Sequence, residues 1–203
     1  MKISYAILAC VELVELNKLL PFLKKYKKKE DEIVVLLDNN TYTALVEEVA
    51  EKYADKVKYR SLDNDFASQK NALIEMCDGD YIFNIDADEI PHTNLMENLG
   101  ELLENNSHID VFYVPRVNTV AGITQEHIHE WRWRVDDKGW VNFPDPQMRI
   151  MKNLSSIRWK GVVHEILRGH NTFVHLPHEE KWSIYHHKDI KRQEKQNEFY
   201  SRI

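Results

Sequence analysis

The stretch 79–89 constrains the fold most, because it combines a buried strand with a cluster of acids. Its apolar residues are β-branched or aromatic, which is typical of a strand inside a sheet. They are Tyr81, Ile82, Phe83 and Ile85. The stretch ends in Asp86, Asp88 and Glu89. Because open α/β sheets bind ligands at the carboxyl edge of their strands, this pattern predicts a binding site there.

The two aspartates suggest a cation, although their spacing alone does not require one. Asp86 and Asp88 lie two residues apart, so in an extended strand they can face the same object. Converging carboxylates repel each other, and hard oxygen ligands suit Mg²⁺ or Mn²⁺. The alternative is that Asp88 and Glu89 only begin the next helix, where the helix dipole favours acids. The Asp-x-Asp spacing leaves both interpretations open.

The remaining periodicity alternates between strand and helix. Strands are predicted at 3–9, 31–37, 57–62, 79–89 and 110–117, and helices at 13–26, 41–54, 66–76 and 92–105. The turn Asp63-Asn64-Asp65 is predicted to cap the helix 66–76. This order predicts an α/β protein with a mainly parallel central sheet and helices on both faces. No Gly-rich phosphate loop follows the first strand, which argues against a dinucleotide dehydrogenase and a P-loop NTPase.

Length and composition predict one soluble domain. A chain of 203 residues with 43% hydrophobic and 30% charged residues can bury a core, and its net charge of −6 gives no indication of a nucleic-acid partner. No apolar run is long enough to span a membrane, and no signal-peptide pattern is present. Cys10 and Cys77 fit no metal spacing and favour a reducing, cytoplasmic location. The lysine run 24–29 could touch an anionic membrane, although a solvated helix end is favoured.

Beyond residue 117 the hydrophobic periodicity is weak, and the sequence is rich in aromatic and polar residues. No repeat, low-complexity segment or Pro/Gly linker separates this part from the rest. We therefore expect a single domain, 1–203, with two functional halves, 1–117 and 118–203.

Four patches, in order along the chain, resemble glycosyltransferase family 2. They are Asp-Phe-Ala-Ser-Gln-Lys-Asn-Ala-Leu at 65–73, Gly-Asp-Tyr-Ile at 79–82 with Asp-Ala-Asp-Glu at 86–89, Pro-Asp-Pro-Gln-Met-Arg-Ile at 144–150, and Gly-Val-Val-His-Glu at 161–165. The likeness is to small bacterial and viral members, including transferases that decorate lipopolysaccharide core. It implies the GT-A fold and an inverting transfer. The donor would be a nucleotide-diphosphate sugar, bound in the first half with Mn²⁺ or Mg²⁺. The acceptor would be a hydroxyl of a glycan or lipopolysaccharide-like molecule, bound in the second half.

The resemblance also implies a set of metal ligands. Asp88 of the Asp-x-Asp motif is expected to bind the metal directly, and Asp86 to reach it through water or the donor ribose. GT-A enzymes often add a histidine from the C-terminal half, for which we expect His186 first and His164 second. Imidazole beside carboxylates favours Mn²⁺ over Mg²⁺.

An inverting transfer needs a base for the acceptor hydroxyl, and two carboxylates are candidates. Glu165 is favoured because it follows a short apolar strand and Gly161 gives the backbone freedom beside it; Asp145 is the second candidate. The alternative for Glu165 is an ordinary ion pair with an arginine such as Arg149 or Arg168.

Donor recognition is assigned to Ala9, Asp38, Lys70, Asp86 and Ala87. The chain departs from the family here. Cys10-Val11-Glu12 stands where an Asn-Glu pair is usual, and a lysine at position 70 replaces an arginine and so loses its planar fork. These departures leave the nucleotide base open.

Four tryptophans of the second half, Trp131, Trp133, Trp140 and Trp159, could present flat faces to an acceptor sugar, although we expect at least two of them to be buried. Two other functions stay open. One is a metal-dependent hydrolase or phosphodiesterase built on the histidine-rich second half. The other is an inactive module that binds nucleotide sugars.

Overall fold

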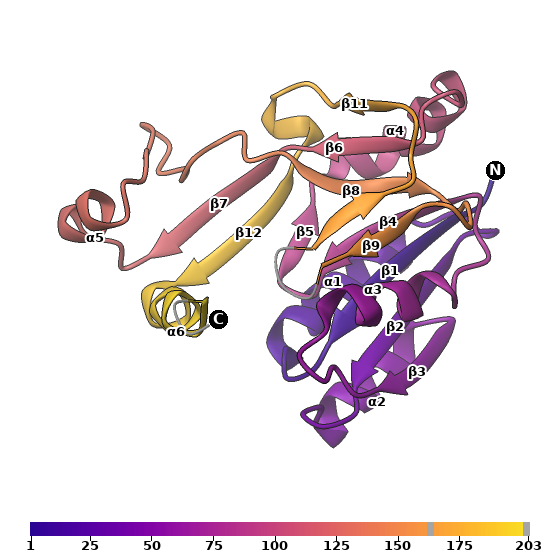
Figure 1. The fold of residues 1–203 in the computed structure, drawn as a ribbon, viewed down its shortest axis with the longest axis horizontal. Helices are drawn as coiled ribbons and strands as arrows, with labels where there is room; N and C mark the ends of the chain where they lie inside the picture. The colour runs from indigo at the N-terminus through magenta and orange to yellow at the C-terminus, as the bar shows by residue number, and fades with distance from the viewer. Residues whose placement is uncertain (162–164, 201–203) are drawn as a thin grey trace.

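The computed structural model describes residues 1–161 and 165–200 (Figure 1). Its strands are β1 Ile3–Ala9, β2 Glu32–Asp38, β3 Lys56–Arg60, β4 Tyr81–Asp86, β5 Glu89–Pro91, β6 Val111–Val114, β7 Arg116–Ala121, β8 Gln147–Lys152, β9 Arg158–Lys160, β10 Ile166–Arg168, β11 Phe173–His175 and β12 Ile184–Asp189. Its helices are α1 Leu13–Tyr26, α2 Ala44–Tyr53, α3 Phe66–Ile74, α4 Thr93–Asn105, α5 Gln125–Glu130, the 3₁₀ turn η1 Glu180–Trp182 and α6 Ile190–Tyr200.

A seven-stranded sheet forms the centre, in the order β11-β6-β8-β4-β1-β2-β3. Strands β4, β1, β2 and β3 run parallel to one another, and β8 lies antiparallel between β4 and β6. The predicted α/β class with a mainly parallel sheet is therefore confirmed. Because β1 and β4 are parallel neighbours, their carboxyl ends meet at one edge of the sheet.

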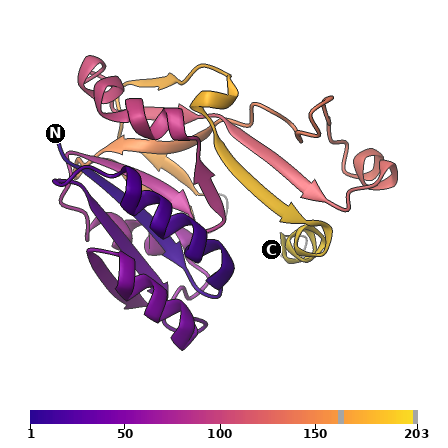
Figure 2. The same ribbon diagram turned by 180° about the vertical axis from the view of Figure 1, so that it is seen from behind.

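The strict alternation of side chains along the strands builds a core on each face of the sheet. Tyr5 and Ile7 of β1 face one side and pack with α1, α2 and α4, which lie in front of the sheet in Figure 2. Ala6 faces the other side, where α3 packs together with β9 and β10. Helices therefore cover both faces, and their apolar stripes fit this role: Leu16, Leu19, Leu20 and Leu23 of α1 are fully buried.

One predicted strand is in fact two strands of different sheets. The segment 110–117 is interrupted at Pro115, and β6 stays in the large sheet while β7 joins a small sheet ordered β5-β12-β7. Proline has no N–H for a ladder bond, so a change of sheet at this residue leaves no donor unpaired. The Pro115 carbonyl accepts a hydrogen bond from the backbone N–H of Ile184, which starts the pairing of β12 with β7.

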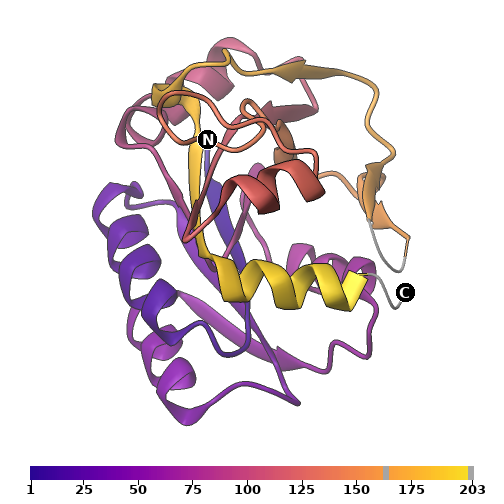
Figure 3. The same ribbon diagram turned by 90° about the vertical axis from the view of Figure 1, so that its left-hand side faces the viewer.

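Strands β7 and β12 extend away from the large sheet and carry α5 and α6 at their far ends (Figure 1). Figure 3 shows α6 running across this end of the molecule below α5. The two helices touch through His127 and Glu194, whose Nε2 and Oε1 atoms are 3.7 Å apart. Among the described residues, no helix combines the length and apolarity needed to cross a bilayer.

The acidic strand 79–89 is shorter than expected. β4 ends at Asp86, a turn follows at Ala87 and Asp88, and β5 begins at Glu89. Asp65 caps α3 as predicted, since its Oδ1 accepts a hydrogen bond from the N–H of Ser68 at 2.9 Å. The sequence pattern missed β8 to β12, because these strands are short or pair with distant segments.

Candidate active site

The site forms where the carboxyl end of β4 meets the small sheet. Antiparallel pairing of β12 with β5 places His186 opposite Glu89 and beside the turn that carries Asp88. His186 Nε2 lies 3.2 Å from Asp88 Oδ2, although 98 residues separate them in the chain. The structure thus brings together Asp88 and His186, two of the residues expected to hold a metal.

Asp86 is held by an arginine. Its carboxylate accepts hydrogen bonds from the guanidinium of Arg149, a buried residue of β8 that also binds the fully buried Glu89. Burial by itself would raise the pKa of Asp86, but the charges of Arg149, Lys70 and Arg116 more than offset this and hold that pKa below its usual range. Asp86 is therefore ionised, and its charge is already balanced within the protein.

Asp88 has different partners. Its Oδ2 atom faces His186 and also lies 3.0 Å from Nη2 of Arg192 on α6. Burial would raise the pKa of Asp88, yet the contacts with His186 and the charge of Arg192 lower it below the ordinary value, while Asp86 acts in the opposite direction. The Asp88 carboxylate is thus held in its ionised form, which is the form that binds a cation.

Arg116 links Glu89 of β5 to the segment before β8. Its Nη1 atom lies 3.3 Å from Glu89 Oε1, and its Nε donates to Asp145 Oδ2 at 2.9 Å. Asp145 Oδ2 also accepts from Nδ2 of Asn118 at 2.7 Å, and Asp145 Oδ1 accepts from Nε2 of Gln147 at 2.9 Å. Burial would raise the pKa of Asp145, but these partners lower it. The backbone of Asp145 has φ near 39°, a strained conformation that its side-chain contacts hold in place.

Glu165, the other candidate base, is paired with Lys70 rather than with either arginine considered above. The Lys70 ammonium group also lies 4.3 Å from the centre of the Trp159 ring. Trp159 is 5% exposed, whereas Trp131, Trp133 and Trp140 are each partly exposed. The expectation that at least two of these tryptophans are buried is therefore wrong, because the 131–140 segment lies on the surface rather than in the core.

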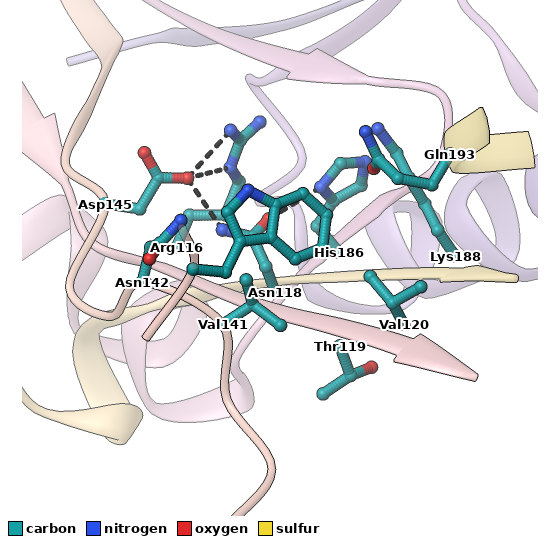
Figure 4. A pocket seen from close by; sticks show the side chains of 11 residues that line it. Arg116, Asn118, Thr119, Val120, Val141, Asn142, Asp145, His186, Lys188 and Gln193 are labelled. Atoms are coloured by element: carbon teal, nitrogen blue, oxygen red, sulfur yellow. Dashed lines mark hydrogen bonds and ion pairs between the residues drawn. The ribbon is translucent and has the colours of Figure 1, made fainter. Parts of the chain in front are cut away.

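Two cavities adjoin at His186. One of about 430 Å³ is lined by Lys70, Asp86, Asp88, Arg149, Trp159 and Glu165 among others. The second, of about 310 Å³, is drawn in Figure 4 and is lined by Asn118, Trp133, Val141, Asn142 and Asp145 among others. Arg116, His186 and Lys188 line both. The first cavity is rich in charged groups, and the second offers amides and an indole, so the two suit ligands of different polarity.

A third, smaller hollow of about 170 Å³ lies at the carboxyl ends of β1 and β2. It is lined by Ala9 and Asp38, together with Leu36, Phe66 and Gln69 among others. The Asp38 side chain accepts hydrogen bonds from Thr41 and from the N–H groups of Leu62 and Asn40. Burial opposes ionisation here, but these bonds lower the pKa of Asp38. Its carboxylate thus organises the loop around this hollow.

The remaining predicted residues are placed as follows. Ala9 and Ala87 are both 6% exposed and belong to the core, so any contact they make with a ligand would involve their main chain. His164 lies outside the described residues. Four further residues belong to the site without having been predicted: Arg116, Asn118, Lys188 and Arg192. No local motif marks them, because β7, β12 and α6 reach the site only through the tertiary fold.

The donor set fits a divalent cation. Asp88 offers a carboxylate oxygen and His186 an imidazole nitrogen, a combination that suits Mn²⁺. Among residues 1–161 and 165–200, no three His, Cys, Asp or Glu side chains form a group able to hold a metal ion. A cation bound through two side chains would take further ligands from substrate phosphates, as is usual for Mg²⁺ sites in phosphate-handling enzymes.

The fold and the position of the site define the class. The chain has the GT-A fold, with polar residues at the carboxyl edge of its parallel strands. The glycosyl transferase family 2 model matches residues 4–167, and the chain belongs to this family.

Solved structures with the same fold include S. aureus TarS. TarS 1–349 matches with 15% identity and a TM-score of 0.61 over 92% of this chain and 60% of that one. Its complex with UDP-GlcNAc matches with 16% identity and a TM-score of 0.62 over 93% and 59%. The longer TarS structure matches with 16% identity and a TM-score of 0.60 over 92% and 37%. This chain therefore spans at most about 60% of the TarS structures, and no curated protein sequence matches it.

Proposed function

We propose that this protein is an inverting, metal-dependent glycosyltransferase that moves a sugar from a nucleotide-diphosphate donor to a hydroxyl of a carbohydrate acceptor. The observation that carries the proposal is the approach of His186 to Asp88 at the carboxyl end of β4. Membership of glycosyl transferase family 2 and the likeness to a TarS structure with UDP-GlcNAc support a nucleotide-sugar donor. UDP-sugars are accordingly the first donors to test.

The charged cavity is the proposed place of the diphosphate and the transferred sugar. Asp88 and His186 would hold Mn²⁺ or Mg²⁺, which as a Lewis acid neutralises charge on the leaving diphosphate. Lys188 and Arg192 add positive charge at the same place. The hollow beside Ala9 and Asp38 would receive the nucleotide base.

Glu165 remains the proposed base. It lines the same cavity as Asp88, and Lys70 is its side-chain partner. Asp145 is less suited, because both of its oxygens already accept hydrogen bonds and its pKa is lowered. A proton acceptor with a depressed pKa is a weaker base.

The second cavity is the proposed acceptor site. Trp133 offers an aromatic face, and Asn118 and Asn142 offer hydrogen-bonding amides, a combination suited to a sugar. The free thiols of Cys10 and Cys77 support a cytoplasmic location within this proposal.

The decisive experiment is replacement of the metal-binding carboxylate. Asp88→Asn should lower Mn²⁺-dependent release of nucleotide diphosphate at least about 100-fold, since loss of several kcal/mol of charge stabilisation has this effect. The assay should cover UDP-, GDP-, CMP- and dTDP-sugars. Asp80→Asn is the matched control, because Asp80 is an exposed aspartate next to the other end of β4. Normal turnover by Asp88→Asn would contradict the metal role, and donor binding without turnover by the unaltered protein would instead indicate a binding module.

A further inference from the structure

The Asn118 side chain lies between Asp145 and His186 and contacts both. It lies on β7 directly in register with His186 on β12, so the two side chains share one rung of the small sheet. Asn118 Nδ2 donates to Asp145 Oδ2 at 2.7 Å, and Asn118 Oδ1 lies 2.8 Å from His186 Nδ1. Figure 4 shows Asn118 beside Arg116 and His186, with dashed lines joining Asp145 to Arg116 and Asn118.

The orientation of the Asn118 amide follows from its neighbour. Asp145 is ionised and can only accept hydrogen bonds, so the NH₂ group of Asn118 must face it. Arg116 holds the same Asp145 oxygen and fixes its position. The carbonyl oxygen of Asn118 is thereby turned toward His186 Nδ1.

The carbonyl in turn selects the histidine tautomer. An oxygen acceptor at Nδ1 requires Nδ1 to carry hydrogen, so in the neutral ring the lone pair is on Nε2. Nε2 faces Asp88 Oδ2 at 3.2 Å, and two lone pairs opposed at this distance are favourable only with a proton or a cation between them. The hydrogen-bonded chain therefore prepares Nε2, and not Nδ1, as the ligand atom.

We propose that Asn118 is a positioning residue that fixes His186 in the Nδ1–H tautomer and so sets the affinity for a divalent cation at Asp88 and His186. This inference rests on the proposed function for the identity of the site. The tautomer itself is a property of the protein without metal, so the two can be tested separately. Partners of metal-bound histidines typically change metal affinity about 10- to 100-fold when they are removed.

The first measurement is the tautomer of His186 in the metal-free protein, by ¹⁵N NMR at a pH at which the ring is neutral. The unaltered protein should show the Nδ1–H form, and Asn118→Ala should show a mixture with the Nε2–H form. Thr119→Val is the matched control. Thr119 contacts His187 on the next rung of the same two strands, so its loss should leave the His186 tautomer unchanged.

The second measurement is the Mn²⁺ dissociation constant, by electron paramagnetic resonance without nucleotide. Asn118→Ala should weaken Mn²⁺ binding about 10- to 100-fold, and Thr119→Val should not. Asn118→Asp separates positioning from a general structural role. It keeps an oxygen acceptor at Nδ1 but opposes Asp145 with a second carboxylate, so a positioning role predicts binding restored above the alanine level. A structural role predicts binding as weak as in Asn118→Ala or weaker.

An Nδ1–H tautomer that persists in Asn118→Ala, or Mn²⁺ binding unchanged in that variant, would overturn the inference. If the unaltered protein has the expected tautomer but does not bind Mn²⁺, the proposed metal dependence fails and the role of Asn118 toward the cation fails with it. Loss of Mn²⁺ binding in Asn118→Asp to or below the alanine level would equally reject positioning.

Discussion

The carboxylates Glu165 and Asp145 have different side-chain partners, and these partners indicate different roles. Glu165 has an ammonium partner in the charged cavity, whereas Asp145 has three different donors and anchors Arg116 and Asn118. Loss of a group that anchors other side chains is expected to weaken ligand binding, whereas loss of a base is expected to lower kcat.

This difference predicts distinct kinetics for Glu165→Gln and Asp145→Asn. If Glu165 is the base, as proposed, Glu165→Gln should lower kcat about 10²- to 10⁴-fold, because the acceptor hydroxyl would lose its proton acceptor, while Mn²⁺ affinity stays unchanged. Asp145→Asn should weaken Mn²⁺ binding through Asn118 and His186. Steady-state kinetics and Mn²⁺ titration of both variants check this. A kcat collapse confined to Asp145→Asn, with Mn²⁺ affinity intact, would assign the base to Asp145 instead.

Glu32 is a buried carboxylate remote from the chemistry that supports the fold. Its oxygens accept from Ser4 Oγ and from the N–H of Asp78, each at 2.6 Å, and pair with Lys2 and Lys56. Burial would raise the pKa of Glu32, but these bonds outweigh it and lower the pKa to about 2. The folded state therefore favours the ionised form.

Glu32→Gln should cost stability in a pH-dependent way. A lowered pKa contributes stability above the unfolded value of 4.5, and this stability is lost as the pH falls toward 2. At pH 7 the ionisation contributes about 3 kcal/mol to the free energy of unfolding. Urea unfolding at pH 7 and pH 3 should show the difference between the two proteins shrinking at the lower pH. Glu104→Gln on the exposed face of α4 is the control, expected within about 0.5 kcal/mol at both pH values. A constant difference would refute the assignment.

At the scale of elements, the Arg192 side chain ties α6 to the site. Arg192 Nη2 lies 3.0 Å from Asp88 Oδ2, and its Nη1 lies 3.3 Å from Glu15 Oε1 on α1. The guanidinium therefore occupies an oxygen that a cation would need. The same residue fastens the C-terminal helix to the first helix of the chain.

Arg192→Ala should consequently raise the affinity for Mn²⁺ in the absence of nucleotide. A partly exposed ion pair contributes up to about 1 kcal/mol, which corresponds to a gain of about 2- to 5-fold. Electron paramagnetic resonance titration measures it. Lys191→Ala removes the neighbouring, exposed cation of α6 and should leave the affinity unchanged. Equal or weaker binding by Arg192→Ala would show that the arginine does not compete for Asp88.

At the scale of the whole molecule, the site joins the large and small sheets. Asp88 follows β4 of the large sheet, and His186 belongs to β12 of the small one. A ligand bound there would contact both sheets, so we expect the single domain predicted for 1–203 to respond as one unit.

Thermal unfolding should therefore show one cooperative transition that moves as a whole when Mn²⁺ and a UDP-sugar are added together. At 100 times the dissociation constant the stabilisation is about 2.7 kcal/mol, or about 5–10 °C for a domain of this size. Differential scanning calorimetry checks both points, and UDP-sugar with EDTA is the control. Two separate transitions, of which only one moves, would mean that the halves unfold independently.

The sequence predicted the features that depend on residues close together in the chain, such as strands, helices and a helix cap. The unbroken apolar run of Tyr5, Ala6 and Ile7 indicates a strand buried on both faces, and the leucines of α1 repeat at helical spacing. Asp65 could be recognised as a cap because the bond it accepts spans three residues. The acids at the end of β4 could be located because they directly follow the apolar run of that strand.

Pairing across long distances was decided by tertiary structure. Arg116 and Asn118 reach the site because Pro115 directs β7 out of the large sheet, and His186 reaches Asp88 because β12 pairs with both β5 and β7. The sequence by itself thus determined strands β1 to β4, helices α1 to α4 and the edge at which acids gather. Which basic side chain or hydrogen-bond donor pairs with each acid depended on contacts between segments far apart in the chain. Such contacts leave no periodic signal in the sequence, because packing and charge balance in three dimensions select them.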